Sequence, residues 1–493
     1  MQAAARAPSR RRQVALLALA AGLSGFTLLR AISPNDEGLM LQAGARIAAG
    51  ELPYRDFWTN YPPGQELVLA GLDKVFGVSM LSWRIMRVAV DATVSLLGYR
   101  LTRRLAPERL ALLAWVAVAG AMAWPTGPGP DPPALGLAFA ALLLAPRKPL
   151  LAGALAGLSV FFRIEIGAAA ALGVILTVPA GSRVHAAIAA ATLAAVSLGP
   201  FFAADPAAMW HDTIGFLAIQ HLQRLPFPLD FHGSLRPSKL IEFYFPLILI
   251  LGSGLWLIAA VSERRTGRGT LALAPLAVVG VGYLLGRTDE FHLLPLSAVL
   301  AVMLAGAAAV ERRLAVRFAL LVGLALIAIN GLERRAGQAL HPPASAAVPG
   351  PAGDGVQTSP ADARALRELI ATVNSLTAPG APIFVANPRF DLVRVGDPLL
   401  YIILGHPNPT RYDVMQPGVV TTAPVQREII RSLRRSHTRL VVRWLDPTAD
   451  SPEPGGAGRS SGVHILDRYL AANFHRYATF GYYEVLVPTI PPR

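Results

Sequence analysis

The chain has 493 residues, of which 53% are hydrophobic and only 15% are charged. A soluble globular protein usually carries roughly 25% charged residues, so this composition excludes an ordinary soluble protein. The formal net charge is +14. Many of the arginines lie in short loops between hydrophobic segments, where they set membrane orientation and do not indicate nucleic-acid binding. The chain contains no cysteine, which excludes disulfides, thiolate metal sites and a cysteine nucleophile.

The N-terminal segment has the pattern of a membrane anchor. Arg10, Arg11 and Arg12 precede an apolar run from Val14 to about Ile32. This run is long and further hydrophobic segments follow, so we expect an uncleaved signal-anchor helix in place of a cleaved signal peptide. The arginines before the run predict a cytoplasmic N-terminus.

Apolar runs of membrane-spanning length recur along the first two-thirds of the chain and predict about eleven transmembrane helices. After the first, we expect them near residues 85–101, 109–124, 132–146, 150–164, 166–180, 185–203, 241–261, 270–286, 292–309 and 314–331. The loops assigned to the cytoplasm carry arginines and few acids, whereas the outer loops mix both signs. We therefore predict a transmembrane domain over 1–335, a first outer loop at 33–83 and an extracytoplasmic C-terminus.

The last third of the chain changes its pattern. Residues 336–360 are rich in Pro, Ala and Gly and predict a linker. Residues 361–493 alternate helical and strand periods, which is typical of an α/β domain. We expect helices at 363–376, 425–435 and 463–474, strands at 382–386 and 440–444, and a strand pair at 477–487 bent at Gly481.

The loop after the first apolar segment carries the most informative residues. Ser33, Pro34 and Asp36 resemble a helix start, with serine as N-cap, proline first and an acid third, and the helix should stop at Gly50. Asp36 and Glu37 then have two interpretations. Either they complement the helix dipole, or a carboxylate beside the membrane acts as a general base, because partial desolvation raises its pKa.

The rest of this loop offers candidates for substrate binding. Arg55 either stabilises a phosphate or forms an ion pair with Asp56 or Glu51. We interpret the aromatic residues as an interfacial belt, with stacking on a sugar or a prenyl chain as the alternative: Tyr54, Phe57, Trp58 and Tyr61. Arg55, Asp56 and Tyr61 are the residues of this loop that we assign to a substrate site.

Two further polar clusters interrupt the apolar sequence at predicted outer turns. Arg163 and Glu165, in FFRIEIG, form either a structural ion pair or part of a phosphate site. The second cluster, in GRTDEFHLLP, is either a solvated turn in which His292 caps the next helix or part of a binding site: Arg287, Asp289, Glu290 and His292. By contrast, Arg87 and Asp91 stand four residues apart within a span and predict a buried pair that orients helices.

The loop motif resembles a known family. An acid pair directly after the first span, a short helix, then G-x-x-P-Y-R-D-F over 50–57 and Y-P-P-G over 61–64 are similar to the GT-C class of integral membrane glycosyltransferases. The branch it resembles most is that of the protein mannosyltransferases and aminoarabinose transferases, family 39. The architecture of the whole chain fits this class, whereas the specific motif covers only Asp36 to about Gln65.

The resemblance implies a reaction. The donor is a sugar on a polyprenyl phosphate, the acceptor is a hydroxyl of a lipid, polysaccharide or protein, and the configuration at the anomeric carbon inverts. Asp36 orients or deprotonates the acceptor, and Glu37 supports it or helps to hold a metal. Members vary in their use of a divalent cation (Mg²⁺ or Mn²⁺), and no complete ligand set is visible. Related proteins carry a polar patch before a late span, so Arg287, Asp289 and His292 are expected to bind the donor phosphate, where charge develops.

Two other classes of function stay open from the sequence. A transporter or flippase of lipid-linked sugars would place its main charges near mid-membrane, often in repeated or broken helices. Here the candidate charges lie at predicted outer turns. A non-catalytic envelope assembly protein would keep the same membrane architecture and bind a partner through its outer domain. We expect a bacterial cytoplasmic membrane protein in each case.

Overall fold

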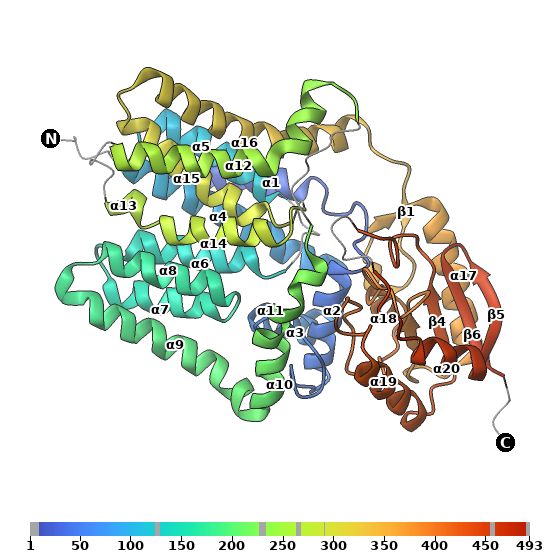
Figure 1. The fold of residues 1–493 in the computed structure, drawn as a ribbon. Helices are drawn as coiled ribbons and strands as arrows, with labels where there is room; N and C mark the ends of the chain where they lie inside the picture. Colours follow the sequence, from blue (N-terminus) through green and yellow to red (C-terminus); the bar gives the residue numbers. More distant parts are fainter. Residues whose placement is uncertain are drawn as a thin grey trace. The chain divides into compact units, whose positions relative to one another are not determined.

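The computed structural model describes residues 9–123, 129–225, 233–262, 268–289, 291–453 and 459–489. The chain divides into two compact units, and Figure 1 labels most of their helices and strands. The first, which we call the helical unit, comprises Met1–Leu28, Ile85–Pro200 and Pro226–Pro342. The second, the mixed unit, comprises Leu29–Arg84, Phe201–Leu225 and Pro343–Arg493. The mixed unit therefore combines the acid-containing loop with the C-terminal third of the chain.

The described part of the helical unit consists of helices joined by turns, and each predicted span overlaps at least one of these helices. They are α1 (Arg10–Gly25), α4 (Met80–Leu105), α5 (Glu108–Met122), α6 (Asp131–Leu144), α7 (Pro149–Val160), α8 (Ile164–Thr177), α9 (Arg183–Ala204), α12 (Pro237–Ser262), α13 (Arg268–Leu271), α14 (Ala274–Gly286), α15 (Leu294–Val310) and α16 (Leu314–Leu340).

Three of these helical segments are long and apolar enough to cross a membrane: Ala180–Ala204, Phe243–Ala260 and Leu314–Leu340. Others are shorter than the apolar runs that predicted them, because each run also includes turn residues. Helix α7 has 12 residues and is about 18 Å long at 1.5 Å per residue. The hydrocarbon core of a bilayer is roughly 30 Å thick. The count of about eleven spans therefore stays a prediction.

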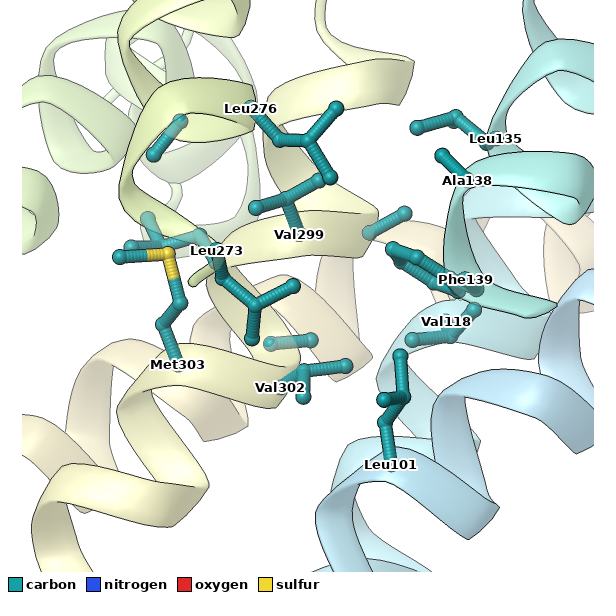
Figure 2. Close-up of a cluster of buried hydrophobic side chains, with 14 of the residues drawn as sticks. Leu101, Val118, Leu135, Ala138, Phe139, Leu273, Leu276, Val299, Val302 and Met303 are labelled. Atoms are coloured by element: carbon teal, nitrogen blue, oxygen red, sulfur yellow. The ribbon is translucent and has the colours of Figure 1, made fainter. Parts of the chain in front are cut away.

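The core of the helical unit surrounds α15. Every residue from Leu294 to Ala308 is buried, as expected for a helix that is apolar on all sides. Figure 2 shows the part of this core where α4, α5, α6, α14 and α15 meet, with labelled side chains Leu101, Val118, Leu135, Ala138, Phe139, Leu273, Leu276, Val299, Val302 and Met303. These side chains form a continuous apolar interior.

Close helix packing in this unit depends on small residues. A Cβ atom at Gly153 of α7 would lie 2.1 Å from the carbonyl oxygen of Ala186 in α9, and one at Gly157 would lie 2.2 Å from that of Ala190. Two glycines four residues apart thus let the two backbones touch, which is how helices commonly associate within a bilayer.

The mixed unit contains short helices and two sheets. Its elements are α2 (Asp36–Ala48), α3 (Gly64–Phe76), α10 (Pro206–Trp210), η2 (His211–Gly215), α11 (Phe216–Ile219), η3 (Gln220–Gln223), β1 (Ala346–Ala347), η4 (Pro351–Gly353), β2 (Gln357–Thr358), α17 (Pro360–Leu376), β3 (Phe384–Ala386), α18 (Leu399–Leu404), α19 (Ala423–Arg435), β4 (Val441–Trp444), α20 (Ile465–Asn473), β5 (Phe474–Phe480) and β6 (Tyr483–Pro488).

The larger sheet has four strands in the order β3-β4-β6-β5. Strands β3 and β4 are parallel, whereas β6 is antiparallel to both β4 and β5. The helices and strands predicted for the last third of the chain are all present, including the bend at Gly481 between β5 and β6. Helix α18 and the β1–β2 pair were not predicted, and α16 continues through the first five residues of the segment predicted as a linker.

Candidate functional site

The candidate acids Asp36 and Glu37 occupy the first turn of α2, and Asn35 is the N-cap residue. The prediction of Ser33 as N-cap is wrong. The carboxylate of Glu37 instead accepts a 3.4 Å hydrogen bond from the Ser33 backbone N–H, and a turn at residues 34–35 precedes the helix. The predicted end is close to the observed one, because Gly50 follows α2 with a φ of +99°, a conformation that favours glycine.

Glu37 forms a fully buried ion pair with Arg84. The Arg84 Nε lies 2.6 Å from one carboxylate oxygen and its Nη2 lies 2.8 Å from the other, and both side chains are 0% exposed. Arg84 also donates to the carbonyls of Arg30 at 3.3 Å and Ala31 at 2.6 Å. Glu37 therefore fixes the chain that enters α2, and Arg84 already occupies both of its oxygens. A metal-holding role does not fit this arrangement.

The side chain of Asp36 is more exposed than that of Glu37. Asp36 is half-buried, and the Asn35 amide donates to its Oδ1 at 3.1 Å. The helix that carries it is held against α18, because a Cβ atom at Gly38 would lie 2.3 Å from the Leu399 backbone nitrogen. Asp36 thus stands on a fixed helix start and remains partly open to solvent.

Arg46, which the sequence pattern did not single out, organises the loop after α2. It is buried and donates to Glu51 at 2.7 Å, to Asp413 at 2.9 Å and to the carbonyl of Thr410 at 3.0 Å. Its guanidinium also lies 5.1 Å from the centre of the Phe57 ring. The burial of Arg46 could have been predicted from its helical spacing. It lies seven residues after buried Leu39 and is therefore on the same face of α2.

Arg55 and Asp56, both predicted to bind substrate, pair with each other at the surface. The Arg55 Nη2 lies 2.7 Å from an Asp56 oxygen, and the Arg55 side chain is 49% exposed. The Leu52 backbone N–H donates to the same carboxylate at 2.8 Å. The hydrogen bond from Arg55 is the main cause that lowers the pKa of Asp56. The ion-pair interpretation of Arg55 is therefore confirmed.

Three of the four aromatic residues of this loop are buried and do not form an interfacial belt. Tyr54, Phe57 and Trp58 are 0%, 1% and 3% exposed, so that prediction is wrong for these three. They are buried because they pack inside the mixed unit, where Trp58 meets the Phe216 ring edge-on at 5.7 Å. Tyr61 is half-buried, and its carbonyl accepts a 2.8 Å hydrogen bond from the Tyr54 hydroxyl. Tyr61 therefore remains a candidate substrate contact.

Two buried acids of the mixed unit were not predicted as site residues. Burial raises the pKa of Glu66 to about 8, although a 2.8 Å hydrogen bond from the Thr59 hydroxyl opposes this shift. Burial also raises the pKa of Asp212 to about 6, against the effects of His211 and Arg411. The Arg411 Nη2 lies 3.3 Å from Asp212. Neither acid lies in a recognisable motif, so tertiary burial alone distinguishes them.

In the helical unit, the structure brings the two predicted outer clusters together. Arg163 lies 3.2 Å from buried Asp131 at the start of α6 and also contacts Glu165. Its guanidinium lies 4.9 Å from the centre of the Tyr283 ring, and Tyr283 in turn lies 4.3 Å from the His292 ring, centre to centre. We call these five residues, together with Arg287 and Asp289, the helix-end cluster.

The second half of the helix-end cluster is organised by Asp289. This carboxylate contacts the Arg287 Nε and the His292 Nδ1. It also accepts hydrogen bonds from the backbone N–H groups of Phe291 and His292, both at 3.1 Å. Asp289 therefore caps the turn before α15, and the prediction that His292 does so is wrong. Glu290 lies outside the described residues.

Arg87 and Asp91 form the predicted buried pair, 3.6 Å apart and 0% and 1% exposed. Among the described residues, the one group of three metal-ligating side chains is elsewhere, at Asp391, His464 and Asp467. Arg389 already pairs with Asp391 there, and a cation at this place would have to displace that guanidinium. The described residues thus offer no ready metal site at Asp36.

The comparisons with known proteins agree with this architecture. No family model and no curated protein sequence matches the chain. Among solved structures, the fold is similar to those of GT-C glycosyltransferases, so the chain has a GT-C-like fold.

ArnT from Cupriavidus metallidurans, bound to undecaprenyl phosphate, superposes with a TM-score of 0.57 at 15% identity, covering 98% of this chain and 100% of that one. Its apo state gives a TM-score of 0.56 at 14% identity, covering 97% and 99%. The mycobacterial arabinofuranosyltransferase AftD gives a TM-score of 0.50 at 15% identity, covering 98% of this chain and 42% of that one.

Proposed function

We propose that this protein is a membrane glycosyltransferase that moves a sugar from a polyprenyl-phosphate donor to an acceptor hydroxyl, with inversion. The GT-C-like fold over nearly the whole chain supports this class, as does the solved ArnT structure with undecaprenyl phosphate bound. We further propose that the protein resides in a bacterial cytoplasmic membrane, with the N-terminus inside and residues 361–493 outside.

The observation that carries the proposal is the different placement of two adjacent acids. Glu37 is held by Arg84 with both oxygens occupied, whereas Asp36 is half-buried at the first position of α2. A base must reach the proton that it removes. The partial exposure of Asp36 supports this role more than the buried, paired state of Glu37 does. We therefore assign Asp36 to the acceptor hydroxyl, whose oxygen then attacks the anomeric carbon while the lipid phosphate leaves. Glu37 acts as a positioning residue.

We assign the donor phosphate to the helix-end cluster. Arg163 faces two acids of different exposure: Asp131 is 5% exposed, whereas the Glu165 side chain is 41% exposed. A phosphate can displace the exposed Glu165 from the guanidinium while Asp131 continues to hold Arg163 in place. Arg287 adds positive charge, which favours the leaving phosphate as its charge develops, and His292 is a further candidate contact. Arg55, Asp56 and Tyr61 remain weaker candidates for substrate contact.

The test compares sugar transfer by wild type, Asp36→Asn and Glu368→Gln in membranes supplied with radiolabelled polyprenyl-phosphate sugars. Asn keeps the size and hydrogen bonding of Asp36 but cannot take a proton, so transfer should fall about 10²–10⁴-fold. Glu368 is an exposed acid on α17, and its replacement should leave transfer unchanged.

Both variants should insert in the membrane in wild-type amounts. Equal transfer by wild type and Asp36→Asn would remove Asp36 from catalysis. No transfer by any of the three proteins would favour the transporter or assembly alternatives.

A further inference from the structure

A cavity of about 330 Å³ lies within the mixed unit, at the end of the four-stranded sheet. This volume falls in the range of about 300–1,000 Å³ that small-molecule sites occupy. Five stretches of chain line the cavity, namely 30–34, 343–345, 357–362, 444–446 and 482–483. Segments far apart in sequence thus converge on one concave surface.

Aromatic residues form one side of the cavity. Trp444 ends β4 and Tyr483 begins β6, and the two are directly opposite in the antiparallel register, so their side chains lie on the same face of the sheet. Tyr482 stands beside them in the β5–β6 turn and is 46% exposed. The Leu445 N–H donates to the Tyr482 carbonyl at 2.7 Å, which fixes this turn against the end of β4.

Polar groups with defined positions form the other side. Ser359 caps α17 by accepting a 3.0 Å hydrogen bond from the Asp362 N–H, and the Thr358 hydroxyl donates to the Asp362 carboxylate at 3.2 Å. Asp446 accepts from the Thr448 N–H at 2.8 Å. The carboxylates are therefore held in place by their neighbours and still line the cavity.

The charge of the cavity selects against an anion. Asp362 and Asp446 line it, and Arg30 is the basic residue among its lining. Burial raises the pKa of Asp397 to about 8, and the charges of Asp362 and Asp446 act in the same direction, so these three acids interact. A phosphate would meet repulsion here. The exposed Tyr482 ring beside carboxylate acceptors instead suits a neutral molecule with many hydroxyl groups. The C–H face of such a molecule packs on the ring while its hydroxyls donate to the acids.

We propose that this cavity binds a saccharide, and that the saccharide is the acceptor of the transfer reaction. The identification of this saccharide as the acceptor rests on the proposed function. It is supported by the position of the cavity in the chain, since Ile32 and Pro34 line the cavity and Asp36 follows only two residues after Pro34. The cavity thus defines the acceptor as a sugar-containing molecule.

The test measures binding without transfer. The full chain, purified in detergent, is mixed with a fixed panel of methyl α-D-mannopyranoside, methyl β-D-galactopyranoside and methyl α-L-arabinofuranoside, with glycerol as a polyol control. Saturation-transfer NMR then reports contact with the protein. At least one glycoside should be saturated and glycerol should not, and Tyr482→Ala or Asp446→Asn should lower the signal at least fivefold.

Tyr477→Ala is the matched control, because Tyr477 is a tyrosine of β5 with 56% exposure that does not line the cavity. Its signal should equal that of wild type, and Tyr482→Phe, which keeps the ring, should retain most of it. Absence of saturation for the whole panel, or an equal loss in Tyr477→Ala, overturns the proposal. Binding that persists in Asp36→Asn while transfer is absent separates this proposal from the proposed function.

Discussion

The two units differ in how completely their buried acids are paired with arginines. In the described part of the helical unit, each of the buried acids Asp91, Asp131 and Glu311 contacts an arginine, at 3.6, 3.2 and 2.8 Å. In the mixed unit, the buried acids Glu37 and Asp413 also contact arginines. Among the described residues, however, no basic side chain lies within ion-pair distance of three other buried acids: Glu66, Asp73 and Asp397. Burial raises their pKa values to about 8, 6 and 8.

This difference follows from the surroundings of each unit. Next to lipid, an ionised side chain is costly unless a partner neutralises it, so acids in a membrane unit need arginines. In the mixed unit, an acid can take a proton from solvent and remain neutral when buried. Paired charges stay ionised and can bind a charged substrate, whereas unpaired acids make stability depend on pH. Variants that break one pair or neutralise one lone acid test this contrast.

The largest effect is expected from Arg84→Gln, which tests the one fully buried pair beside the candidate base. The substitution leaves Glu37 buried without its cation and should lower the free energy of unfolding by about 3–5 kcal/mol. Thermal unfolding of the purified chain, followed by tryptophan fluorescence, measures this loss.

Two controls accompany this variant. Arg12 pairs with Glu108 at the surface, where the side chains are 50% and 38% exposed, so Arg12→Gln should cost at most about 1 kcal/mol. Adding Glu37→Gln to Arg84→Gln removes the orphaned charge and should recover part of the stability. Similar losses in the Arg84 and Arg12 variants would contradict the importance of the buried pair.

Arg163→Gln should have the next largest effect, on transfer. If the paired arginine binds the donor phosphate, its loss should reduce transfer about 10²-fold, and Arg163→Lys should recover only part of this because lysine lacks the planar fork. Donor titrations separate binding from turnover.

Glu165→Gln is the informative control for Arg163, because the proposed phosphate displaces Glu165. This variant should bind donor at least as well as wild type. A loss of donor binding in Glu165→Gln as large as that in Arg163→Gln would show that the ion pair itself, and not the guanidinium, is required.

How much the sequence predicted also differs between the units. In the helical unit, a charge within an apolar run is conspicuous, so Arg87, Asp91 and five of the seven residues of the helix-end cluster could be selected before the structure was known: Arg163, Glu165, Arg287, Asp289 and His292. What could not be predicted was that Tyr283 links Arg163 to His292, because α14 meets the other helix ends only in the folded unit. In the mixed unit, polar residues are common. Apart from the helical spacing of Arg46 from Leu39, nothing in the local pattern distinguishes buried Arg46 or Glu66 from exposed Arg55.

The same argument applies to secondary structure. Strands β3, β4 and the β5–β6 pair were predicted because their apolar runs end at turn residues such as Gly481. Helix α18 was missed because six apolar residues, 399–404, resemble a buried strand as much as a helix. Its helical state depends on packing against α2 at Gly38, a contact between residues more than 350 positions apart.

Glu66→Gln tests whether a buried acid without an arginine partner makes the stability of the protein depend on pH. The pKa of Glu66 is about 8 in the folded protein and near 4.3 in an unfolded chain. The folded state therefore binds the extra proton, and stability falls as pH rises between these values. Raising the pH from 6 to 8 should destabilise wild type by about 2 kcal/mol more than Glu66→Gln, which cannot titrate. Melting temperatures across this range measure the difference, and parallel pH profiles for the two proteins would exclude a buried, neutral Glu66.

Arg55→Ala should have the smallest effect, because its pair lies where water and salt weaken the attraction between the two charges. Arg55 is 49% and Asp56 31% exposed, so removing Arg55 should change the free energy of unfolding by less than about 1 kcal/mol. The Asp56 carboxylate still accepts from Leu52, which keeps the turn intact. Transfer should then change less than about threefold, measured beside Arg163→Gln in the same membranes. A loss of transfer in Arg55→Ala as large as that in Arg163→Gln would assign the donor phosphate to this loop. It would also mean that the exposure of an ion pair does not predict its role in transfer.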